Sequence, residues 1–356
     1  MDRTVVRYKT QQINLLYMNK NTNSTKHPID VVITWVNGDD KEHKAKRKAY
    51  TTDQNETSRE DIGGETRFRS VGEIAYCVAS INKFAPYVRK IFIVTDDQNP
   101  MIEEFINSQY PNAIPMEIVS HKTLFRGYEE YLPVFNSLAI ETMLWRIPDL
   151  SEHYVYMNDD VMLVTPTTEE TFFQDGKAVT YGYWHWTFTA RLTRLLRKKR
   201  NGHKMFTFKD SMLNAVVKSG PGLRFHRIRH IAHAMRKSVF QEYFDKKPDD
   251  ILANIQHRFR HADQYNPQAL FYNVAIRKKK AISRPIGETE LYMKGADRGV
   301  SDYVDNKLKL FDERSGAVFC CLNSLDLMSV EERYKVVTWL KERIGLNEYF
   351  INIEKE

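Results

Sequence analysis

The chain has 356 residues, of which 42% are hydrophobic and 12% aromatic, and its formal net charge is +7. That apolar content is enough for a sizeable core and excludes a largely disordered protein. No apolar run approaches the roughly 18 residues of a membrane span, and the start of the sequence lacks the apolar core of a signal peptide. The positive charge favours anionic partners such as nucleotide-sugars, acidic polymers, lipid surfaces or nucleic acid.

Three cysteines are present, and two of them, Cys320 and Cys321, are adjacent. With Cys77 they form neither a disulfide framework nor a spaced metal cluster, so we expect a reducing, cytoplasmic location. Segment 1–27 is rich in Asn, Thr and Lys towards its end, and we predict that it is peripheral to the fold.

From residue 28 onward, apolar strands alternate with amphipathic helices. Strands are expected at 29–36, 90–96, 116–119 and 154–158, and helices at 41–50, 74–84, 100–108 and 136–146. Alternation of this kind predicts an α/β fold with a mostly parallel sheet and right-handed crossovers. The polar stretch 51–66 is predicted to be a loop.

The strand at 154–158 ends abruptly at two adjacent carboxylates, Asp159 and Asp160. In open α/β sheets ligands bind outside the carboxyl ends of the strands, so this pair is expected at a binding edge. Magnesium prefers oxygen ligands and commonly takes one or two carboxylates together with substrate phosphate. The pattern therefore indicates a metal–diphosphate site, and a solvated turn is the alternative.

A basic amphipathic insertion is predicted at 180–215. Trp184 and Trp186 precede a run of Arg and Lys, and Leu192, Leu195 and Leu196 share one face of it. A basic helix with Trp at its start is typical of segments that lie on anionic membranes. Segment 184–200 is thus a candidate contact with the inner face of a bacterial cytoplasmic membrane, and a solvated helix with a narrow apolar stripe is the alternative.

Residues 226–261 contain clustered histidines and arginines. Three-residue spacing would place His230 and His233 on one face of a helix. A zinc site would lack further ligands at finger spacing, so the mixture of His and Arg fits an anionic substrate better. At the C-terminus, Ser329 and Glu332 form a capping box, and 327–356 is predicted to be a C-terminal packing helix.

Four of these stretches resemble the signature blocks of the Stealth family, and they occur in the family's order. This family comprises the hexose-1-phosphate transferases of microbial capsule synthesis and the related lysosomal-enzyme GlcNAc-1-phosphotransferase. The matching stretches are Asp30–Gly38, Arg67–Asp160, His230–His233 with Arg258–Arg260, and Cys321–Asn323. Three positions depart from the family pattern, which has proline where Ala232 stands, an acid at Ser324 and often Asp at Asn37.

The resemblance implies a glycosyltransferase-A-like α/β core in a catalytic domain spanning 28–326, with helical and basic segments as lid or accessory parts. It implies transfer of a sugar-1-phosphate from a nucleotide-sugar, by analogy UDP-hexose or UDP-HexNAc, to a hydroxyl of a saccharide or growing capsule polymer. The nucleoside monophosphate leaves, and Mg²⁺ (or Mn²⁺) is the expected cofactor. Such a reaction depends on charge neutralisation and in-line positioning.

Carried onto this sequence, the family blocks suggest a catalytic, a donor-binding and a metal-binding set. Asp159 and Asp160 are expected to hold the metal, and the catalytic set is His233, Asp30 and Arg258. The donor-binding set is Arg67, Asn136, Asn158 and Arg260. His233 is the candidate general base on the acceptor hydroxyl because the imidazole pKa lies near working pH, and His230 is second in that role.

Two other functions remain open from the sequence. An ordinary glycosyltransferase, which attacks the anomeric carbon, would use the same acidic pair. A non-enzymatic basic polymer-binding protein would also suit the charge of +7. Nothing resembles an RNA- or DNA-binding motif, so nucleic acid is not an expected partner.

Overall fold

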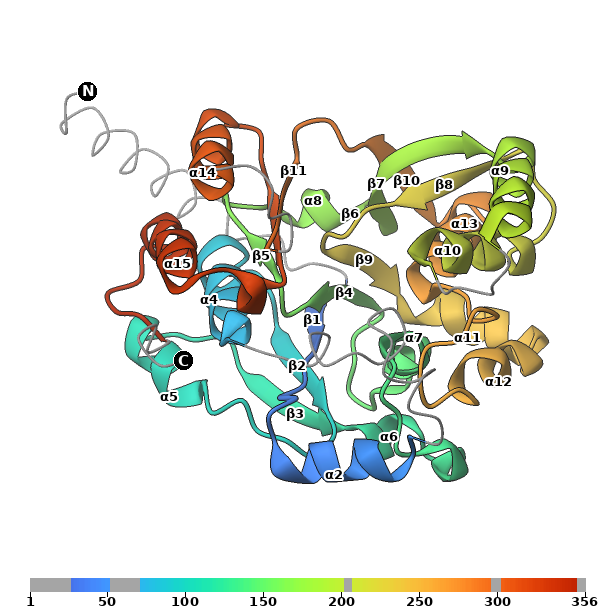
Figure 1. Cartoon of the computed structure of the whole chain (residues 1–356), viewed down its shortest axis with the longest axis horizontal. Coiled ribbons are helices and arrows are strands. Elements are labelled where there is room, and N and C mark those ends of the chain that lie inside the picture. Colours follow the sequence, from blue (N-terminus) through green and yellow to red (C-terminus); the bar gives the residue numbers. More distant parts are fainter. Residues whose placement is uncertain (1–26, 52–70, 202–206, 296–301, 351–356) are drawn as a thin grey trace.

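The computed structural model describes residues 27–51, 71–201, 207–295 and 302–350. Its centre is a five-stranded sheet in the order β3–β2–β1–β4–β9 (Figure 1). The strands are β1 (Ile29–Thr34), β2 (Lys90–Thr95), β3 (Met116–Ser120), β4 (His153–Asn158) and β9 (His233–Arg236). The first four are parallel and only β9 runs antiparallel, against β4. The predicted mostly parallel α/β core is confirmed.

The four parallel strands are short, β-branched and apolar, as expected for strands with helices on both faces. Their interior residues are almost fully buried in β1, β2 and β4. The helices between them are α2 (Lys41–Ala49), α4 (Glu73–Phe84), α5 (Glu103–Gln109), α6 (His121–Leu124) and α7 (Ser137–Met143). Each predicted strand and helix of this region is therefore present, with ends shifted by a few residues.

Strand order reverses at β1. The chain adds β2 and β3 on one side of β1 and then returns to place β4 on the other side. Thr34, at the end of β1, is level with Val94 on β2 and with Asn158 on β4. The carboxyl ends of these strands therefore meet at the topological switch point, where open α/β sheets bind their ligands.

Two smaller sheets flank the main one. In one, β7 (Lys177–Trp186) pairs with β6 (Phe173–Gln174), β8 (Arg224–Ile228) and β10 (Ala281–Pro285). In the other, β12 (Phe319–Asn323) lies between β11 (Glu290–Lys294) and β5 (Val161–Leu163). Because β5 follows Asp160 directly, this third sheet brings the end of β12 beside the end of β4.

The remaining helices cover the sheets from both sides (Figure 1). They are α8 (Glu169–Phe172), α9 (Thr187–Asn201), α10 (Phe208–Lys218), α11 (Lys237–Lys246), α12 (Asp249–Ile255), α13 (Pro267–Arg277), α14 (Tyr303–Glu313) and α15 (Val330–Ile344). Helix α15 begins at the predicted Ser329–Glu332 capping box and packs against α4 and α14. Among the described residues, no helix combines the length and the apolar character needed to cross a bilayer.

Two local predictions are wrong. The basic helix is present as α9, but Trp184 and Trp186 lie at the end of strand β7 and not within the helix, so the stretch 180–215 is a strand followed by two helices. His230 lies in a loop and His233 begins β9, so these two histidines do not share a helical face. Strand pairing decides the backbone conformation in both cases. Trp184 and Trp186 are on β7, which pairs with β8, and His233 is on β9, which pairs with β4.

Candidate active site

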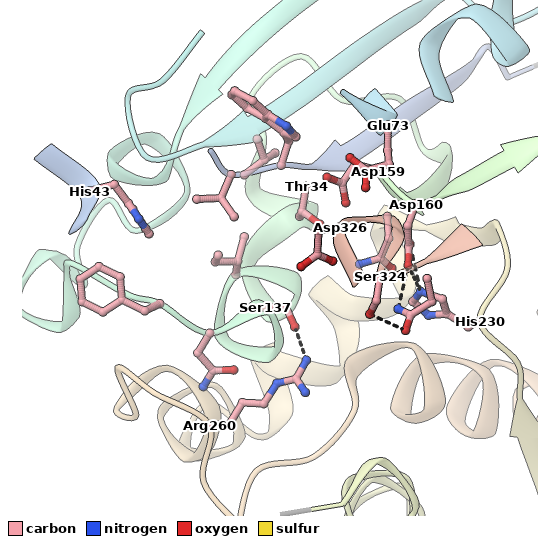
Figure 2. Close-up of a pocket in the computed structure, with 18 of the residues that line it drawn as sticks. Thr34, His43, Glu73, Ser137, Asp159, Asp160, His230, Arg260, Ser324 and Asp326 are labelled. Carbon is pink, nitrogen blue, oxygen red and sulfur yellow. Dashed lines mark hydrogen bonds and ion pairs between the residues drawn. The ribbon is translucent and has the colours of Figure 1, made fainter. Parts of the chain in front are cut away.

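A pocket of about 880 Å³ opens at the switch point. Thr34 at the end of β1, Asn158 at the end of β4 and Ser324 after β12 all line it. Figure 2 shows His43 at one end of the pocket and His230 with Asp160 at the other. A cavity of this size, with charged groups gathered at one end, suits a ligand as large as a nucleotide-sugar.

Asp159 and Asp160 line this pocket, as the sequence predicted. Burial raises the pKa of Asp159 well above its usual range, and the neighbouring Asp160 and Glu73 carboxylates raise it further. Burial alone would also raise the pKa of Asp160, but His230 and the side chains of Asn323 and Cys321 hold it below its usual value. Without a cation, one carboxylate of the pair therefore stays ionised more readily than the other.

His230 is the histidine of this pocket. Its Nε2 lies 3.1 Å from Oδ1 and 3.3 Å from Oδ2 of Asp160. Burial by itself would lower the pKa of His230, but the charge and hydrogen bond of Asp160 raise it above the usual value. The His230 side chain is 36% exposed, so it remains within reach of a ligand.

The end of β12 completes this polar cluster. The amide of Asn323 donates to Oδ2 of Asp160 at 3.2 Å, and the hydroxyl of Ser324 donates to Oδ1 of Asn323 at 3.1 Å. Ser324 has a left-handed backbone conformation with φ 60°. The neighbouring Gly295 must lack a side chain, because a Cβ there would lie 2.1 Å from the Ser324 carbonyl oxygen. The hydrogen bonds from His230 and Asn323 hold the Asp160 carboxylate in this orientation.

Arg260 supplies a positive charge to the pocket, and its Nη2 donates to the hydroxyl of Ser137 at 3.3 Å (Figure 2). Asn158 and Asn136 also line the pocket. The amide of Asn136 is already occupied: it donates to three oxygens, including Oε1 of Gln264 at 2.8 Å, while Oδ1 caps α7. The hydrogen bonds of Asn136 therefore give it a structural role in the wall of the pocket.

The acidic corner fits a hard divalent cation. Asp159 and Asp160 offer adjacent carboxylates, Glu73 adds a third nearby, and Thr34 and Asn158 offer neutral oxygens. Oxygen donors of this kind are the ligands of Mg²⁺ and Mn²⁺. The raised pKa of Asp159 is also consistent with a cation site, since a bound cation would stabilise the ionised form of this carboxylate. Asp160, His230 and Cys321 also have donor atoms within 4.8 Å of one another, a softer set than Mg²⁺ prefers.

The expected role of Asp30 is wrong. Asp30 lies at the amino end of β1, the opposite edge of the sheet, and does not line the pocket. Its fully buried carboxylate accepts hydrogen bonds from Nε and Nη2 of Arg89, at 2.8 and 2.6 Å, and from the backbone N–H of Ser151 at 2.7 Å. Asp30 therefore anchors two loops at the base of the sheet.

The expected roles of His233 and Arg258 are also wrong. His233 is 6% exposed on β9, packs against Tyr272 and does not line the pocket, and burial lowers its pKa to about 3. The guanidinium of Arg258 donates to the carbonyls of Glu130 and Leu132 instead of facing the pocket. Arg67 lies outside the described residues.

Five titratable residues of the pocket were not predicted from the sequence: Glu73, Lys294, Asp326, His43 and His121. Lys294 ends β11. Glu73 begins α4 and Asp326 lies in the 3₁₀ helix η4 (Leu325–Leu327), whereas His43 is on α2 and His121 begins α6. Of these residues, only His121 could have been predicted at the pocket from the sequence. It directly follows a strand whose carboxyl end lies at the same edge of the sheet as that of β4. The others depend on tertiary packing.

Comparison with known proteins identifies the family. The model described as Stealth protein CR1, conserved region 1, matches residues 27–53, and that of Stealth protein CR2, conserved region 2, matches residues 67–180. A capsular polysaccharide phosphotransferase of Haemophilus influenzae is 30% identical over 279 residues, 75% of this chain and 70% of the relative. The chain belongs to the Stealth family.

Other Stealth relatives are longer than this chain. The match to an exopolysaccharide phosphotransferase of Streptomyces coelicolor is 30% identical and covers 82% of this chain but 51% of the relative. That to a capsular polysaccharide phosphotransferase of Neisseria meningitidis serogroup B is 32% identical and covers 67% of this chain and 61% of the relative. The chain thus spans about half to three fifths of these two relatives.

Solved structures with a similar arrangement of elements include the galactosyltransferase LgtC in complex with donor and acceptor sugar analogues. That match has 10% sequence identity and a TM-score of 0.39, and it covers 82% of this chain and 86% of LgtC. The bifunctional glycosyltransferase WbbM matches with 8% identity and a TM-score of 0.43, covering 91% of this chain and 51% of WbbM.

Proposed function

We propose that this Stealth protein transfers a sugar-1-phosphate from a nucleotide-sugar to a hydroxyl of a saccharide in capsule or exopolysaccharide synthesis. The acceptor oxygen attacks the β-phosphorus, the bond from that phosphorus to the oxygen bridging the two phosphates breaks, and the nucleoside monophosphate leaves. The product is a phosphodiester between two sugars. Membership of the family, whose relatives are named as phosphotransferases, supports this proposal.

The observation that carries the proposal is the polar end of the pocket. It combines the Asp159–Asp160 pair, the Asp160–His230 hydrogen bond and the Arg260 guanidinium around one cavity. Phosphoryl transfer needs charge stabilisation and in-line positioning, together with a group that takes the proton of the attacking hydroxyl. These residues provide each of those elements within one cavity.

His230 takes the role of general base that the sequence assigned first to His233. It accepts the proton of the acceptor hydroxyl at its imidazole, while Asp160 orients the ring and stabilises the imidazolium that forms. Arg260 binds phosphate oxygens, for which a guanidinium is well suited. Asp159 and Asp160 would hold Mg²⁺ or Mn²⁺, which when bound would neutralise phosphate charge. Asn158 would orient the donor.

The test is incubation with a panel of UDP-hexoses and UDP-HexNAcs, an oligosaccharide acceptor and Mg²⁺ or Mn²⁺, followed by phosphorus NMR of the product. We expect a phosphodiester resonance in the saccharide and release of UMP. Release of UDP with a phosphorus-free product would overturn the proposal in favour of attack at the anomeric carbon. Absence of any nucleotide-sugar turnover, with salt-sensitive binding of an anionic polymer, would favour the non-enzymatic alternative.

We further propose that segment 184–200, together with the adjacent residues Leu223 and Arg224, makes a peripheral contact with an anionic membrane surface. Trp184, Trp186, Phe188 and Leu223 are all about half exposed or more, at 49%, 51%, 75% and 81%. The N–H of Thr187 donates a hydrogen bond to the carbonyl of Leu223, and this bond holds Leu223 beside the start of α9. Exposed aromatic and apolar side chains beside basic ones are typical of surfaces that rest on anionic lipid.

Charge reversal on this surface should weaken lipid binding. Arg191 is exposed on α9, and the guanidinium of Arg224 lies 4.2 Å from the ring centre of Trp186. Each reversal, Arg191→Glu or Arg224→Glu, should lower affinity for phosphatidylserine vesicles at low salt about fivefold or more, since a basic residue near such a surface contributes about 1 kcal/mol. Lys335→Glu on α15 is the matched control (Figure 1). Wild-type protein that does not sediment with these vesicles would refute the contact.

A further inference from the structure

Asp160 takes part in two groups of donor atoms. With Asp159 and Glu73 it forms the oxygen-rich corner that suits Mg²⁺ or Mn²⁺. With His230 and Cys321 it forms a second group of mixed chemistry, which contains one carboxylate, one imidazole and one thiol. The reaction proposed above uses the carboxylate and the imidazole of this second group but not its thiol.

The backbone holds the three residues of the second group close together. Asp160 directly precedes β5, and Cys321 on β12 pairs with Val161 on β5. The N–H of Leu322 donates to the carbonyl of Asp160 at 2.9 Å, and His230 comes from the loop between β8 and β9. The donor groups therefore come from three separate parts of the chain, and main-chain hydrogen bonds between two of these parts fix Asp160 beside Cys321.

The distances between the donor atoms match a tetrahedral metal site. Nε2 of His230 lies 3.1 Å from Oδ1 of Asp160 (Figure 2), and Sγ of Cys321 lies 3.7 Å from Oδ2. One donor atom of each residue lies within 4.8 Å of the other two. Zinc bonds of about 2.0–2.3 Å at tetrahedral angles place ligand atoms roughly 3.4–3.6 Å apart. A zinc ion therefore fits among the three residues with adjustment of their side chains alone.

The group is open to the pocket on one side. The side chains of His230 and Asp160 are 36% and 17% exposed and line the pocket, whereas Cys321 is buried and does not line it. A cation can therefore enter from the pocket and keep a water molecule as its fourth ligand on that side. The amide of Asn323 donates to Oδ2 of Asp160 at 3.2 Å, and hydrogen bonds of this kind orient ligating carboxylates.

The donor types select the cation. Mg²⁺ prefers oxygen ligands, whereas imidazole and thiolate together favour zinc and similar thiophilic metals. The corner at Asp159 and Glu73 has the opposite preference, because its side chains offer oxygen alone. Two adjoining donor sets of different chemistry therefore share the Asp160 carboxylate.

We propose that Asp160, His230 and Cys321 form a binding site for Zn²⁺ and that Zn²⁺ bound there inhibits the protein. As the zinc–sulfur bond forms, the sulfur–hydrogen bond breaks and the proton leaves to solvent. The imidazole gives its free lone pair to the cation, so it has none left to accept the proton of the acceptor hydroxyl. The Asp160 carboxylate is withdrawn from the Mg²⁺ corner at the same time. Inhibition rests on the proposed function, whereas binding of zinc does not.

Cobalt titration of the metal-free protein tests the site without any substrate, because Co²⁺ replaces zinc in tetrahedral sites and its absorption reports its ligands. After removal of metal with EDTA, wild-type protein should develop a thiolate-to-cobalt charge-transfer band, and added Zn²⁺ should abolish this band by displacement. Cys321→Ser should lack the band. His230→Ala should weaken zinc binding on the order of 100-fold, since even loss of a ligand's hydrogen-bond partner costs 10–100-fold in metal affinity.

Cys320→Ser and His261→Ala are the matched controls. Cys320 is the neighbouring buried thiol on β12, and His261 does not line the pocket. Both variants should keep the wild-type spectrum and zinc affinity, and circular dichroism checks that each variant is folded. The site is overturned if wild-type protein shows no charge-transfer band, if folded Cys321→Ser keeps it, or if His230→Ala binds zinc like wild type. His230→Ala alone decides if Cys321→Ser does not fold.

Inhibition is measured with the phosphorus NMR transfer assay. In the presence of Mg²⁺, transfer by wild-type protein and by Cys320→Ser should stop as Zn²⁺ fills the site that cobalt detects. Full transfer with that site filled would overturn the inhibition and leave only a binding site. If no transfer occurs even without zinc, the proposed reaction fails, whereas the cobalt spectra still decide whether the zinc site exists.

Discussion

Replacing either carboxylate of the acidic pair should abolish most transfer without unfolding the protein. We expect Asp159→Asn and Asp160→Asn each to lower turnover about 10²–10⁴-fold, since phosphoryl transfer loses several kcal/mol of stabilisation without a metal ligand. The melting temperature of Asp159→Asn should be unchanged or higher, because burial and the neighbouring carboxylates already disfavour the ionised form of Asp159. Steady-state kinetics and thermal melts of the same preparations measure both effects.

Asp30→Asn is the matched control, because it also neutralises a buried carboxylate of the sheet. Asp30 accepts hydrogen bonds from Arg89 and from the Ser151 N–H and does not line the pocket. We expect the opposite pattern: a loss of about 2 kcal/mol of stability, as for hydrogen bonds to a charged group, with turnover of the folded protein retained. Near-normal turnover of both Asp159→Asn and Asp160→Asn with saturating Mg²⁺ would remove the pair from the mechanism.

The sequence was sufficient to predict the central sheet and its binding edge. Strand periodicity is local, and β4 ends at Asn158, directly before the acidic pair, because an apolar strand leaves the core where polar residues begin. Parallel strands with short crossovers then place Thr34 and Asn158 level with each other. The position of the acidic pair at the carboxyl edge follows from these two facts alone, and both residues line the pocket there. Their role as metal ligands stays a prediction.

The choice of histidine and the role of Asp30 were predicted incorrectly for two different reasons. His230 and His233 are three residues apart, and a helix would have made them equivalent, but pairing of β9 with β4 turns His233 into the core and leaves His230 in the preceding loop. Asp30 is in a family block that touches the pocket at its far end, Thr34 to Val36. Asp30 is near the start of β1, so the carboxyl-edge rule by itself places it at the opposite edge of the sheet; its catalytic role was inferred from the family block alone.

His230→Ala should separate binding from transfer. A general base takes the proton from the attacking hydroxyl, so its loss slows transfer about 10²–10⁴-fold and leaves nucleotide-sugar affinity near the wild-type value. His233→Ala is the control from the same segment. It should keep the transfer rate of folded protein and lower the melting temperature, because removal of a buried ring leaves a cavity. Loss of activity in His233→Ala, with His230→Ala active, would reverse this assignment.

The pH dependence of the rate gives an independent test. Asp160 raises the pKa of His230 above the usual value near 6.5. A base works only when deprotonated, so the wild-type rate should fall as the pH decreases through that raised pKa, and His230→Ala should lack this acid limb. In Asp160→Asn the pKa of His230 should move down, which NMR titration of the imidazole can follow even where activity is too low to measure. His233, with a pKa of about 3, would place the limb far lower. An acid limb that persists unchanged in His230→Ala would show that another group takes the proton.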